Sequence, residues 1–468
     1  MQCELWGEPV LVIISDLHLT DGSSGETIRE SAFADFRERL RDLAYDASWR
    51  TDGKYRPLEE IDVVLLGDIL DVIRSTKWLA IAERPWSSPQ NAGFIKKVLE
   101  INSAILDHNK VSVGILKSLT TGSSLSLPPA TESGKPAFTA RDIPGSADRI
   151  PIKVRLHYLV GNHDWFYHLP GRDYDEMRRR VVDTLGLNNN PANPFPHDPK
   201  ESGELMTLYG AHRVFARHGD IFDKLNFEDT RDGSSIGDAI VVELVDRFPL
   251  VVARELGSDL PKACAEGLRE IDNVRPLLLI PVWVNGLVRR TCSEVVGQKI
   301  KDIWDGLADD FIHLPFVVDR LWTQKLFGSV AKLEWALKFS HGVSFGELGE
   351  VSSWLSTKFA SHESSFYPNT FSEPSFRSDD VGFIIYGHTH HHEIVPLDIA
   401  HNSSQDCTKI YINSGTWRAV HELSRFRIAQ QEFAAYHVMT YLAFFKDDER
   451  SGRRFETWSG TLGMARQV

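Results

Sequence analysis

Histidine, aspartate and asparagine residues gather in five short clusters that lie far apart along the chain. The clusters read DLH at Asp16–His18, GD at Gly67–Asp68, GNHD at Gly161–Asp164, HGD at His218–Asp220 and GHTH at Gly387–His390. The last is the densest, because four histidines lie within the five positions from 388 to 392. Any single cluster would suit an ordinary polar turn. Imidazole, carboxylate and amide-oxygen groups together, however, are ligands that suit Mn²⁺, Fe²⁺ or Zn²⁺, so the set predicts a metal site.

The residue types favour two ions over one. Two divalent ions about 3.5–4 Å apart can share a hydroxide, orient a phosphoryl group and stabilise its in-line displacement. A carboxylate is the natural bridge, because its two oxygens can serve both ions. In an extended segment His388 and His390 lie on the same side, so neighbouring ions can each take one. The expected ion is Mn²⁺, with Fe²⁺ and Zn²⁺ as alternatives.

Each cluster follows a short apolar run that is rich in valine and isoleucine. The runs are Val10–Ile14, Ile61–Leu66, Leu156–Val160, Val214–Ala216 and Val381–Tyr386, and Lys409–Ile412 before NSGTW continues the series. Runs of this length and composition predict buried strands. Crevices in an open α/β sheet lie at the carboxyl ends of its strands. The strands would therefore bring the distant clusters together.

Helices and loops are expected between these strands. Ser31–Ala47 and Gly93–Leu106 have apolar residues at helical spacing and charged residues opposite. Three polar segments that are rich in proline, glycine, serine or asparagine predict loops, namely Thr120–Pro151, Asn188–Gly203 and Ser361–Asp380.

A long helical stretch separates the fourth cluster from the fifth. Most of the chain from Ile236 to Phe359 has the pattern of helices. The chain is therefore divided into an α/β domain, residues 1–235 and 375–468, and a mostly helical insertion, residues 236–374, that would cap the site. Within the insertion, Pro276–Val288 is almost wholly apolar. This stretch is too short to span a bilayer. It is expected to be buried core, with a substrate wall or a membrane-surface patch as alternatives.

The ordered clusters resemble the calcineurin-like metallophosphoesterase superfamily, whose pattern is D-x-H, GD, GNH[DE], a later H and GHxH. The resemblance covers roughly Val10–Asp223 and Val381–Trp417 but not the insertion. It implies a two-sheet β-sandwich flanked by helices. It also implies a role for each matching residue: Asp16, His18 and His390 on the first metal, Asn162, His218 and His388 on the second, and Asp68 as the bridge. His163 would contact or protonate the substrate, with Asp164 as its orienting partner.

Within that superfamily, HGD followed by a helical insertion before GHTH is most similar to the UDP-2,3-diacylglucosamine pyrophosphohydrolases of lipid A synthesis. The chain departs from them in reading GNHD where they read GNRD, and GHTHHH where they read GHTHRP. It is also much longer. His163 instead matches the general superfamily pattern.

Composition limits the classes of molecule that the protein is expected to bind. The net charge of −13 is unfavourable for a general binder of nucleic acid, which needs clustered lysine and arginine. The four cysteines form no CxxC pair, which indicates reduced thiols in a cytoplasmic protein. No apolar run is long enough to span a membrane, although peripheral membrane contact stays open. The expected partner is a phosphorylated small-molecule or lipid-linked substrate, and the oligomeric state is left undetermined.

Several residues beside the clusters have two interpretations each. Acidic neighbours either support the ligands or begin helices, and His391 and His392 are expected to be solvated. The aromatic residues after the GNHD turn either line the pocket mouth or anchor the loop, and the residues of the NSGTW segment either support the site or pack. A basic group is expected to be a solvated helix face, with a phosphate clamp as the alternative. The residues are Asp71, Asp220 and Asp223; Trp165 and Phe166; Asn413, Thr416 and Trp417; and Arg172, Arg178, Arg179 and Arg180.

The sequence thus predicts a metal-dependent hydrolase of phosphoester bonds that uses a metal-bridging hydroxide as nucleophile. A phosphodiester or pyrophosphate is the expected substrate. Alternatives are a nuclease or a phosphomonoesterase of the same superfamily, or a non-catalytic interaction module on the same fold. No GxSxG motif, phosphate-binding loop or dinucleotide fingerprint stands at a position where the corresponding chemistry would need one.

Overall fold

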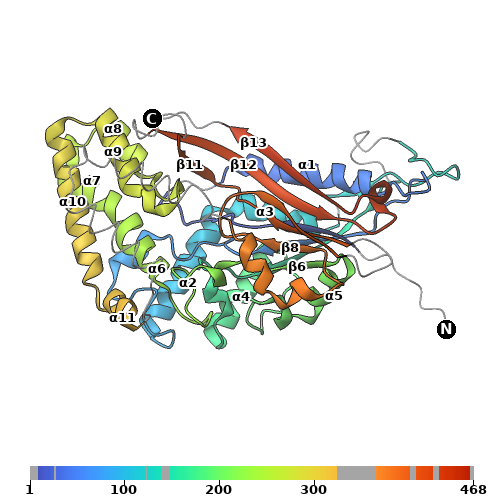
Figure 1. Ribbon diagram of the computed structural model, residues 1–468, viewed down its shortest axis with the longest axis horizontal. Helices are drawn as coiled ribbons and strands as arrows, with labels where there is room; N and C mark the ends of the chain where they lie inside the picture. Colours follow the sequence, from blue (N-terminus) through green and yellow to red (C-terminus); the bar gives the residue numbers. More distant parts are fainter. Residues whose placement is uncertain are drawn as a thin grey trace.

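The computed structural model describes residues 9–25, 28–122, 124–138, 148–323, 365–400, 407–424 and 432–463. In these ranges the protein is a mixed α/β structure with two main sheets, a layer of helices over one of them and a helical end (Figure 1).

The larger sheet has seven strands in the order β5-β2-β1-β12-β11-β7, with β13 also paired to β12. Its parallel part, β5-β2-β1, contains three of the expected strands. An antiparallel part built on β12 continues the sheet. The bounds are β1 Val10–Ile14, β2 Glu60–Leu66, β5 Lys153–Leu159, β7 Val274–Arg275, β11 Ala419–Leu423, β12 Phe433–Phe444 and β13 Phe455–Gly463.

The smaller sheet has four strands in the order β6-β8-β10-β9 and holds the other three expected strands. Strand β8 pairs in parallel with both β6 and β10, whereas β9 is antiparallel. The bounds are β6 Val214–Ala216, β8 Phe383–Tyr386, β9 Glu393–Ala400 and β10 Cys407–Asn413. A separate pair, β3 Ser126–Leu127 and β4 Ile150–Pro151, lies at the two ends of a predicted loop.

The two sheets pack face to face. Successive side chains of a strand point to opposite faces, so one face of β1 can contact the smaller sheet while the other contacts the helices. Leu11 and Ile13 of β1 belong to one apolar cluster with residues of the smaller sheet such as Ile385. The alternate residues Val10, Val12 and Ile14 belong instead to the cluster beneath the helices. Strand β1 is therefore buried on both faces, which explains why its sequence is a continuous apolar run.

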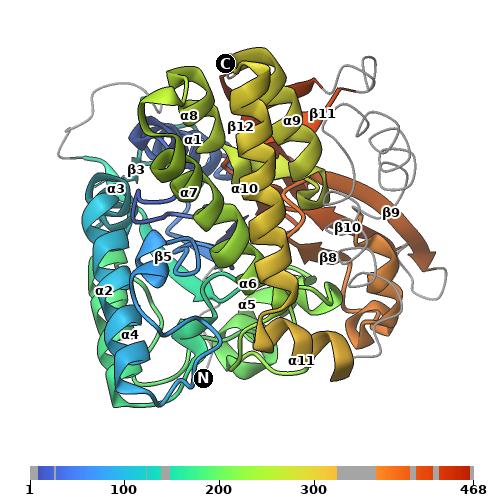
Figure 2. The same ribbon diagram turned by 90° about the vertical axis from the view of Figure 1, so that its left-hand side faces the viewer.

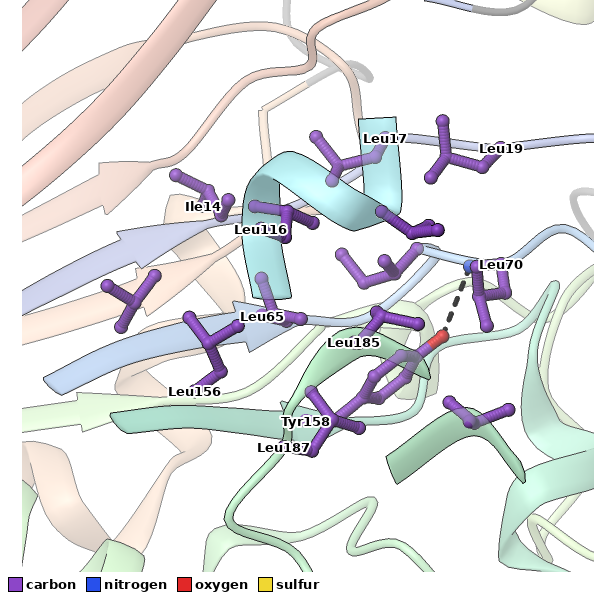
Figure 3. Close-up of a cluster of buried hydrophobic side chains, with 14 of the residues drawn as sticks. Ile14, Leu17, Leu19, Leu65, Leu70, Leu116, Leu156, Tyr158, Leu185 and Leu187 are labelled. Carbon is purple, nitrogen blue, oxygen red and sulfur yellow. Dashed lines mark hydrogen bonds between the residues drawn. The ribbon is translucent and has the colours of Figure 1, made fainter. Parts of the chain in front are cut away.

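Helices cover the outer face of the larger sheet. They are α1 Glu30–Ala47, α2 Ala92–His108, α3 Lys110–Thr120 and α4 Arg172–Leu185, and α5 Gly203–Ala211 leads into β6. Figure 3 shows how strand residues Leu65 and Leu156 meet helix residues Leu116 and Leu185 in this layer. The same view shows the Tyr158 hydroxyl accepting a hydrogen bond from the backbone N–H of Leu70, at 3.1 Å. This bond ties the ends of β5 and β2 together.

The insertion forms a helical layer at one end of the molecule, at the left of Figure 1 and toward the viewer in Figure 2. It contains α6 Ile236–Ile240, a π-helical turn Val241–Asp246, α7 Arg247–Leu256, α8 Lys262–Leu268, α9 Ile280–Thr291, α10 Glu294–Ile312 and α11 Pro315–Thr323. These helices share their own apolar cluster. The expected helix beyond residue 323 lies outside the described residues.

Two features of the insertion bear on the site. The apolar stretch Pro276–Val288 supplies buried core residues, among them Trp283, Val284 and Leu287, so the core interpretation of this stretch is confirmed. The insertion is also not purely helical. Its strand β7 pairs in parallel with β11 and joins the larger sheet. None of the described helices is both long and apolar enough to cross a membrane.

Candidate metal centre

The predicted ligands all lie where strands end. Asp16 and His18 follow β1, Asp68 follows β2, Asn162 follows β5, His218 follows β6, and His388 and His390 follow β8. All are buried except His388, whose side chain is only 8% exposed. The parallel strands and the packing of the two sheets thus bring five distant segments to one place.

The backbone at these ligands is unusual. Nine described residues other than glycine have a positive φ, and five of them are predicted ligands: Asp16, His18, Asp68, His388 and His390. This conformation is uncommon for residues with a side chain and costs about 1–3 kcal/mol each in strain. It persists where the surrounding structure imposes it, which is frequent at functional sites.

The first group contains Asp16, His18 and His390, whose ligand atoms all lie within 4.8 Å of one another. Nε2 of His18 lies 2.9 Å from Nε2 of His390. Oδ1 of Asp16 lies 3.4 Å from Nε2 of His390 and 3.9 Å from Nε2 of His18. Two imidazole nitrogens and one carboxylate oxygen therefore converge on one point.

The second group contains Asp68, His218 and His388, which meet the same distance criterion. Nε2 of His218 lies 3.2 Å from Oδ2 of Asp68 and 3.3 Å from Oδ1 of Asn162. That amide oxygen is also 2.9 Å from Nδ1 of His388. The four residues match the set expected for the second ion and the bridge.

Asp68 stands between the two groups. Its Oδ2 atom is 3.2 Å from Nε2 of His218 in the second group and 3.6 Å from Nε2 of His18 in the first. Burial alone would raise the pKa of Asp68, but the imidazoles of His218 and His163 hold that pKa well below its ordinary value. A buried, ionised carboxylate between two sets of nitrogen donors fits a bridging ligand. The donor set as a whole therefore fits two divalent ions of the borderline class.

His163 lies beside Asp68 and differs from the ligands in being more exposed, at 14% of its side chain. Its backbone N–H donates to Oδ1 of Asp68 at 2.8 Å, which fixes the turn. Burial lowers the pKa of His163, but Asp71 and Asp68 outweigh that effect and raise it to about 9. The raised pKa favours the protonated imidazole when no ion is bound, and His163 also lies close enough to His18 and Asp68 for the three to form a ligand group.

The orienting partner of His163 is Asp71, and the prediction that Asp164 plays this role is wrong. Oδ1 of Asp71 lies 2.9 Å from Nδ1 of His163, and Oδ2 of Asp71 lies 2.7 Å from Nδ1 of His18. One carboxylate therefore orients both a predicted ligand and the predicted acid. The acidic residue that follows the GD cluster supports the site.

Asp164 points away from His163 and holds the surrounding loops. Its carboxylate accepts hydrogen bonds from the backbone N–H of Ile69 at 2.8 Å, the backbone N–H of Gly161 at 2.6 Å and the hydroxyl of Tyr158 at 2.6 Å. Burial and the nearby Asp68 raise the pKa of Asp164 to about 6. Asp164 thus links the ends of β2 and β5 and holds the GNHD turn in place.

The two acidic residues after His218 have different partners. Oδ2 of Asp223 lies 3.1 Å from Nε2 of His388, opposite the nitrogen that faces Asn162, so Asp223 orients a ligand. Asp220 pairs with Arg231 and lies 3.1 Å from Nε2 of His197. Asp220 therefore stabilises the loop without touching the ligand groups.

Most of the other residues that flank the ligand clusters have packing or supporting roles. His391 is exposed, and Nδ1 of His392 is 2.7 Å from the Asn413 carbonyl, so neither histidine joins the two groups. Trp165 and Phe166 are buried in the core and anchor the GNHD turn. Thr416 donates to the carbonyl of Asp16 at 2.7 Å.

The arginines of α4 either face solvent or make contacts within the helical layer. Arg172 and Arg179 are exposed, and Arg180 donates to Ser103 at 2.6 Å. Arg178 is fully buried and donates to the carbonyls of Tyr167 and Leu169, at 3.0 and 2.6 Å. The expectation of a solvated face fails at Arg178, because its guanidinium fixes the backbone that follows the GNHD turn.

The sequence did not mark a second basic group, which contacts the candidate metal centre. Nη2 of Arg275, in the insertion, lies 3.1 Å from Nδ1 of His390. Arg74 and Arg418 lie behind it and share the buried carboxylate of Asp272. No motif marks these residues, because they come from three separate segments and meet only in the folded chain.

Comparison with protein-family models and with curated proteins found no match for the chain.

Proposed function

We propose that the protein is a dinuclear metal-dependent phosphoester hydrolase of the calcineurin-like metallophosphoesterase superfamily. The observation that carries the proposal is the sharing of Asp68 between two ligand groups, Asp16-His18-His390 and Asn162-His218-His388. Such an arrangement suits two ions close enough to act on one substrate. The packing of a mixed sheet against a second sheet is compatible with the fold that this superfamily implies.

The bound ions would activate a water molecule and neutralise charge on the phosphoryl oxygens. The chain's own residues do the rest. Asp68 and the histidines would hold the ions, and five of the predicted ligands lie in turns with a positive φ. His163, oriented by Asp71, donates a proton to the departing alkoxide or phosphate. That proton transfer stabilises the leaving group as its bond to phosphorus breaks.

A metal-dependence assay tests the proposal. The protein is treated with chelator, reloaded with Mn²⁺ and assayed with p-nitrophenyl phosphate and bis(p-nitrophenyl) phosphate, while bound metal is measured by elemental analysis. We expect about two ions per chain, activity that chelator abolishes, and a loss of both metal and activity in His390→Ala. The matched control is His391→Ala, because this neighbouring histidine is exposed and outside the ligand groups.

Two outcomes would overturn this function. One is full activity in the chelated protein. The other is a reloaded protein that binds metal stoichiometrically but hydrolyses neither ester nor any other member of a phosphoester panel, which would favour a non-catalytic module on the same fold.

A further inference from the structure

We propose that Arg275 is a specificity residue that the insertion delivers to the metal centre, where it selects substrates whose reacting phosphate carries two negative charges. The preferred substrate class is then the phosphomonoester, in preference to the singly charged phosphodiester. This inference rests on the proposed function and adds to it the charge of the substrate.

The position of Arg275 is fixed by the larger sheet. Strand β7, Val274–Arg275, pairs with β11 in parallel, and Arg275 is in register with Glu422. Nη1 of Arg275 donates to the carbonyls of Asp272 and Val274, at 2.6 and 2.9 Å. One edge of the guanidinium is thus bound to the backbone, and the other edge, with Nη2, faces His390 at 3.1 Å.

Metal binding would leave this Nη2 atom without its acceptor. Nε2 of His390 faces His18 and Asp16, so Nε2 is the nitrogen available to an ion. A neutral imidazole that ligates through Nε2 carries its proton on Nδ1. The Nδ1–H of His390 and the N–H of Arg275 are then both donors, so their contact becomes unfavourable. Arg275 needs a new acceptor, and the phosphoryl oxygens of a substrate at the neighbouring ions would supply one.

Two further arginines lie near Arg275, and the carboxylates that act on Arg275 are Asp272 and the predicted metal ligands Asp16 and Asp68. Asp272 is shared by Arg74, whose Nε lies 2.9 Å from Oδ2, and by Arg418, which donates to the same oxygen at 2.7 Å. Nη1 of Arg74 is buried and has no hydrogen-bond partner among the residues that the structure describes. Three guanidinium groups therefore gather around Asp272, and Asp16 and Asp68 would be engaged by the proposed ions, so Arg275 needs a further counter-charge.

The pKa values of these groups reflect the same imbalance. Burial and the neighbouring Arg74 lower the pKa of Arg418 to about 10. Burial also lowers the pKa of Arg275, with Asp272 opposing this effect and Arg74 adding to it. Asp246, which lies in the field of Arg74, has a pKa raised well above its ordinary value by burial, so it is a weak source of compensating charge. An anion beside Arg275 would relieve the mutual repulsion.

The charge on the reacting phosphate would then determine which of the two ester classes Arg275 favours. A phosphomonoester ionises twice near neutral pH, whereas a phosphodiester carries one negative charge. An extra guanidinium interacts more strongly with the doubly charged group, and its planar donors can bind two phosphoryl oxygens at once. The apolar stretch that follows Arg275 offers no competing preference for a lipid chain, because it is buried in the core of the insertion.

The test compares p-nitrophenyl phosphate with bis(p-nitrophenyl) phosphate on the Mn²⁺-loaded protein, since both release the same alcohol and differ in charge. We expect the wild-type protein to favour the monoester in kcat/KM. In Arg275→Gln the ratio of monoester to diester kcat/KM should fall about 10- to 100-fold, the loss expected for one charged hydrogen-bonding group. The affinity for inorganic phosphate, measured by calorimetry, should weaken by a similar factor.

Two variants make the result specific. Arg289→Gln makes the same substitution at an exposed arginine of the insertion and should leave the ratio and the phosphate affinity unchanged. Arg275→Lys keeps the charge but loses the paired donors, and should retain part of the preference. It also serves as the deciding variant if Arg275→Gln does not fold. Elemental analysis of each variant checks that His390 still binds its ion.

Failures of the two proposals look different. A wild-type protein that hydrolyses neither ester contradicts the proposed function itself. An active wild-type protein that prefers the diester contradicts the role of Arg275. An equal fall in kcat/KM for both esters in a folded, metal-loaded Arg275 variant also contradicts the role of Arg275. Arg275 would then support His390 without distinguishing the two substrates.

Discussion

Asp71 contacts two histidines at once, through a different oxygen for each. Its distance in sequence from His163 hid this role, whereas Asp164 is the next residue and looked like the partner. Neighbours in sequence need not face each other at the end of a strand, because successive side chains diverge. Asp164 turns back toward the loop N–H groups, and Asp71 reaches His163 from the adjacent strand end.

This difference predicts opposite phenotypes for two amide substitutions. Asp71→Asn should lower kcat about 10- to 100-fold, because a carboxylate that orients a catalytic or ligating histidine is replaced by a neutral group. Asp71→Asn should lower the free energy of unfolding by less than Asp164→Asn does. Steady-state kinetics and denaturant titration measure both quantities.

Asp164→Asn should instead lower the free energy of unfolding by about 2–4 kcal/mol, because one oxygen that accepts buried hydrogen bonds becomes a donor. The folded fraction should keep most of its kcat. If Asp164→Asn removed turnover and left stability intact, the assignment of Asp71 as the partner of His163 would be wrong.

At the residue scale, the sequence predicted which histidines and carboxylates gather in the structure better than it predicted their surroundings. The ligand clusters are local motifs that directly follow apolar runs, and their members meet in the structure. Arg275 and Asp272 belong to no such local motif. The place of Arg275 beside His390 depends on β7 joining the larger sheet, which is a property of the tertiary fold.

Helix α9 shows how an apolar helix can be core rather than membrane surface. Leu287 is 1% exposed and packs over Gly267 of α8, where an added Cβ would lie 2.5 Å from Cδ1 of Leu287. Leu287→Ala should therefore cost about 2–5 kcal/mol in the free energy of unfolding. Val295→Ala, at a side chain that is 69% exposed, should cost less than about 0.5 kcal/mol. A Leu287→Ala protein of wild-type stability would contradict this packing.

The contact between α11 and the loop before α6 should depend on pH. Nε of Arg320 lies 2.6 Å from Oε2 of Glu228, yet burial dominates and raises the pKa of Glu228 from 4.5 to about 7. The folded state then binds a proton that the unfolded state releases. The stability that this group contributes is full below about pH 4.5 and is lost as the pH rises through about 7.

Glu228→Gln, which cannot titrate, should remove this dependence. Its free energy of unfolding should gain on that of the wild type between pH 5 and pH 8, as measured by urea titration across the range. The control is Glu266→Gln, at a glutamate that is 56% exposed. A constant difference between the wild type and Glu228→Gln would show that the carboxyl group titrates normally.

At the element scale, all six expected strands form, because each is a buried apolar run. The antiparallel strands β11, β12 and β13 were not foreseen, and β12 lies at the centre of the larger sheet. The sequence of β12 suits a strand, but its place beside β1 depends on pairing between residues more than four hundred positions apart, such as Leu11 with Phe444. Local patterns contain no information on such a partner.

At the scale of the whole molecule, Asp272 ties the insertion to the α/β domain. It lies in the insertion, whereas its partners Arg74 and Arg418 lie after β2 and before β11, in the two halves of the α/β domain. Asp272→Asn would leave buried guanidinium groups without their carboxylate, which should cost about 3–5 kcal/mol. Differential scanning calorimetry should show one transition in the wild type, and a lower or divided transition in the variant.

The matched control is Asp259→Asn, at an exposed carboxylate of the same insertion that is 64% accessible. Its transition should coincide with that of the wild type, because exposed ion pairs contribute little. If Asp272→Asn also melted like the wild type, the insertion would be coupled to the sheet by other contacts.

The order of strands in the larger sheet has a consequence for how the protein is made. Asp16, His18 and Asp68 leave the ribosome early, but each ligand group also needs a histidine from the GHTH segment near residue 390. Strand β12, which completes the sheet beside β1, is synthesised later still. On the proposed function, neither ligand group is complete until the GHTH segment has been made, so any ion would be fully coordinated only late in synthesis or after it. Fragments released by premature termination before Gly387 would lack one histidine of each ligand group, and on the proposed function they would be inactive.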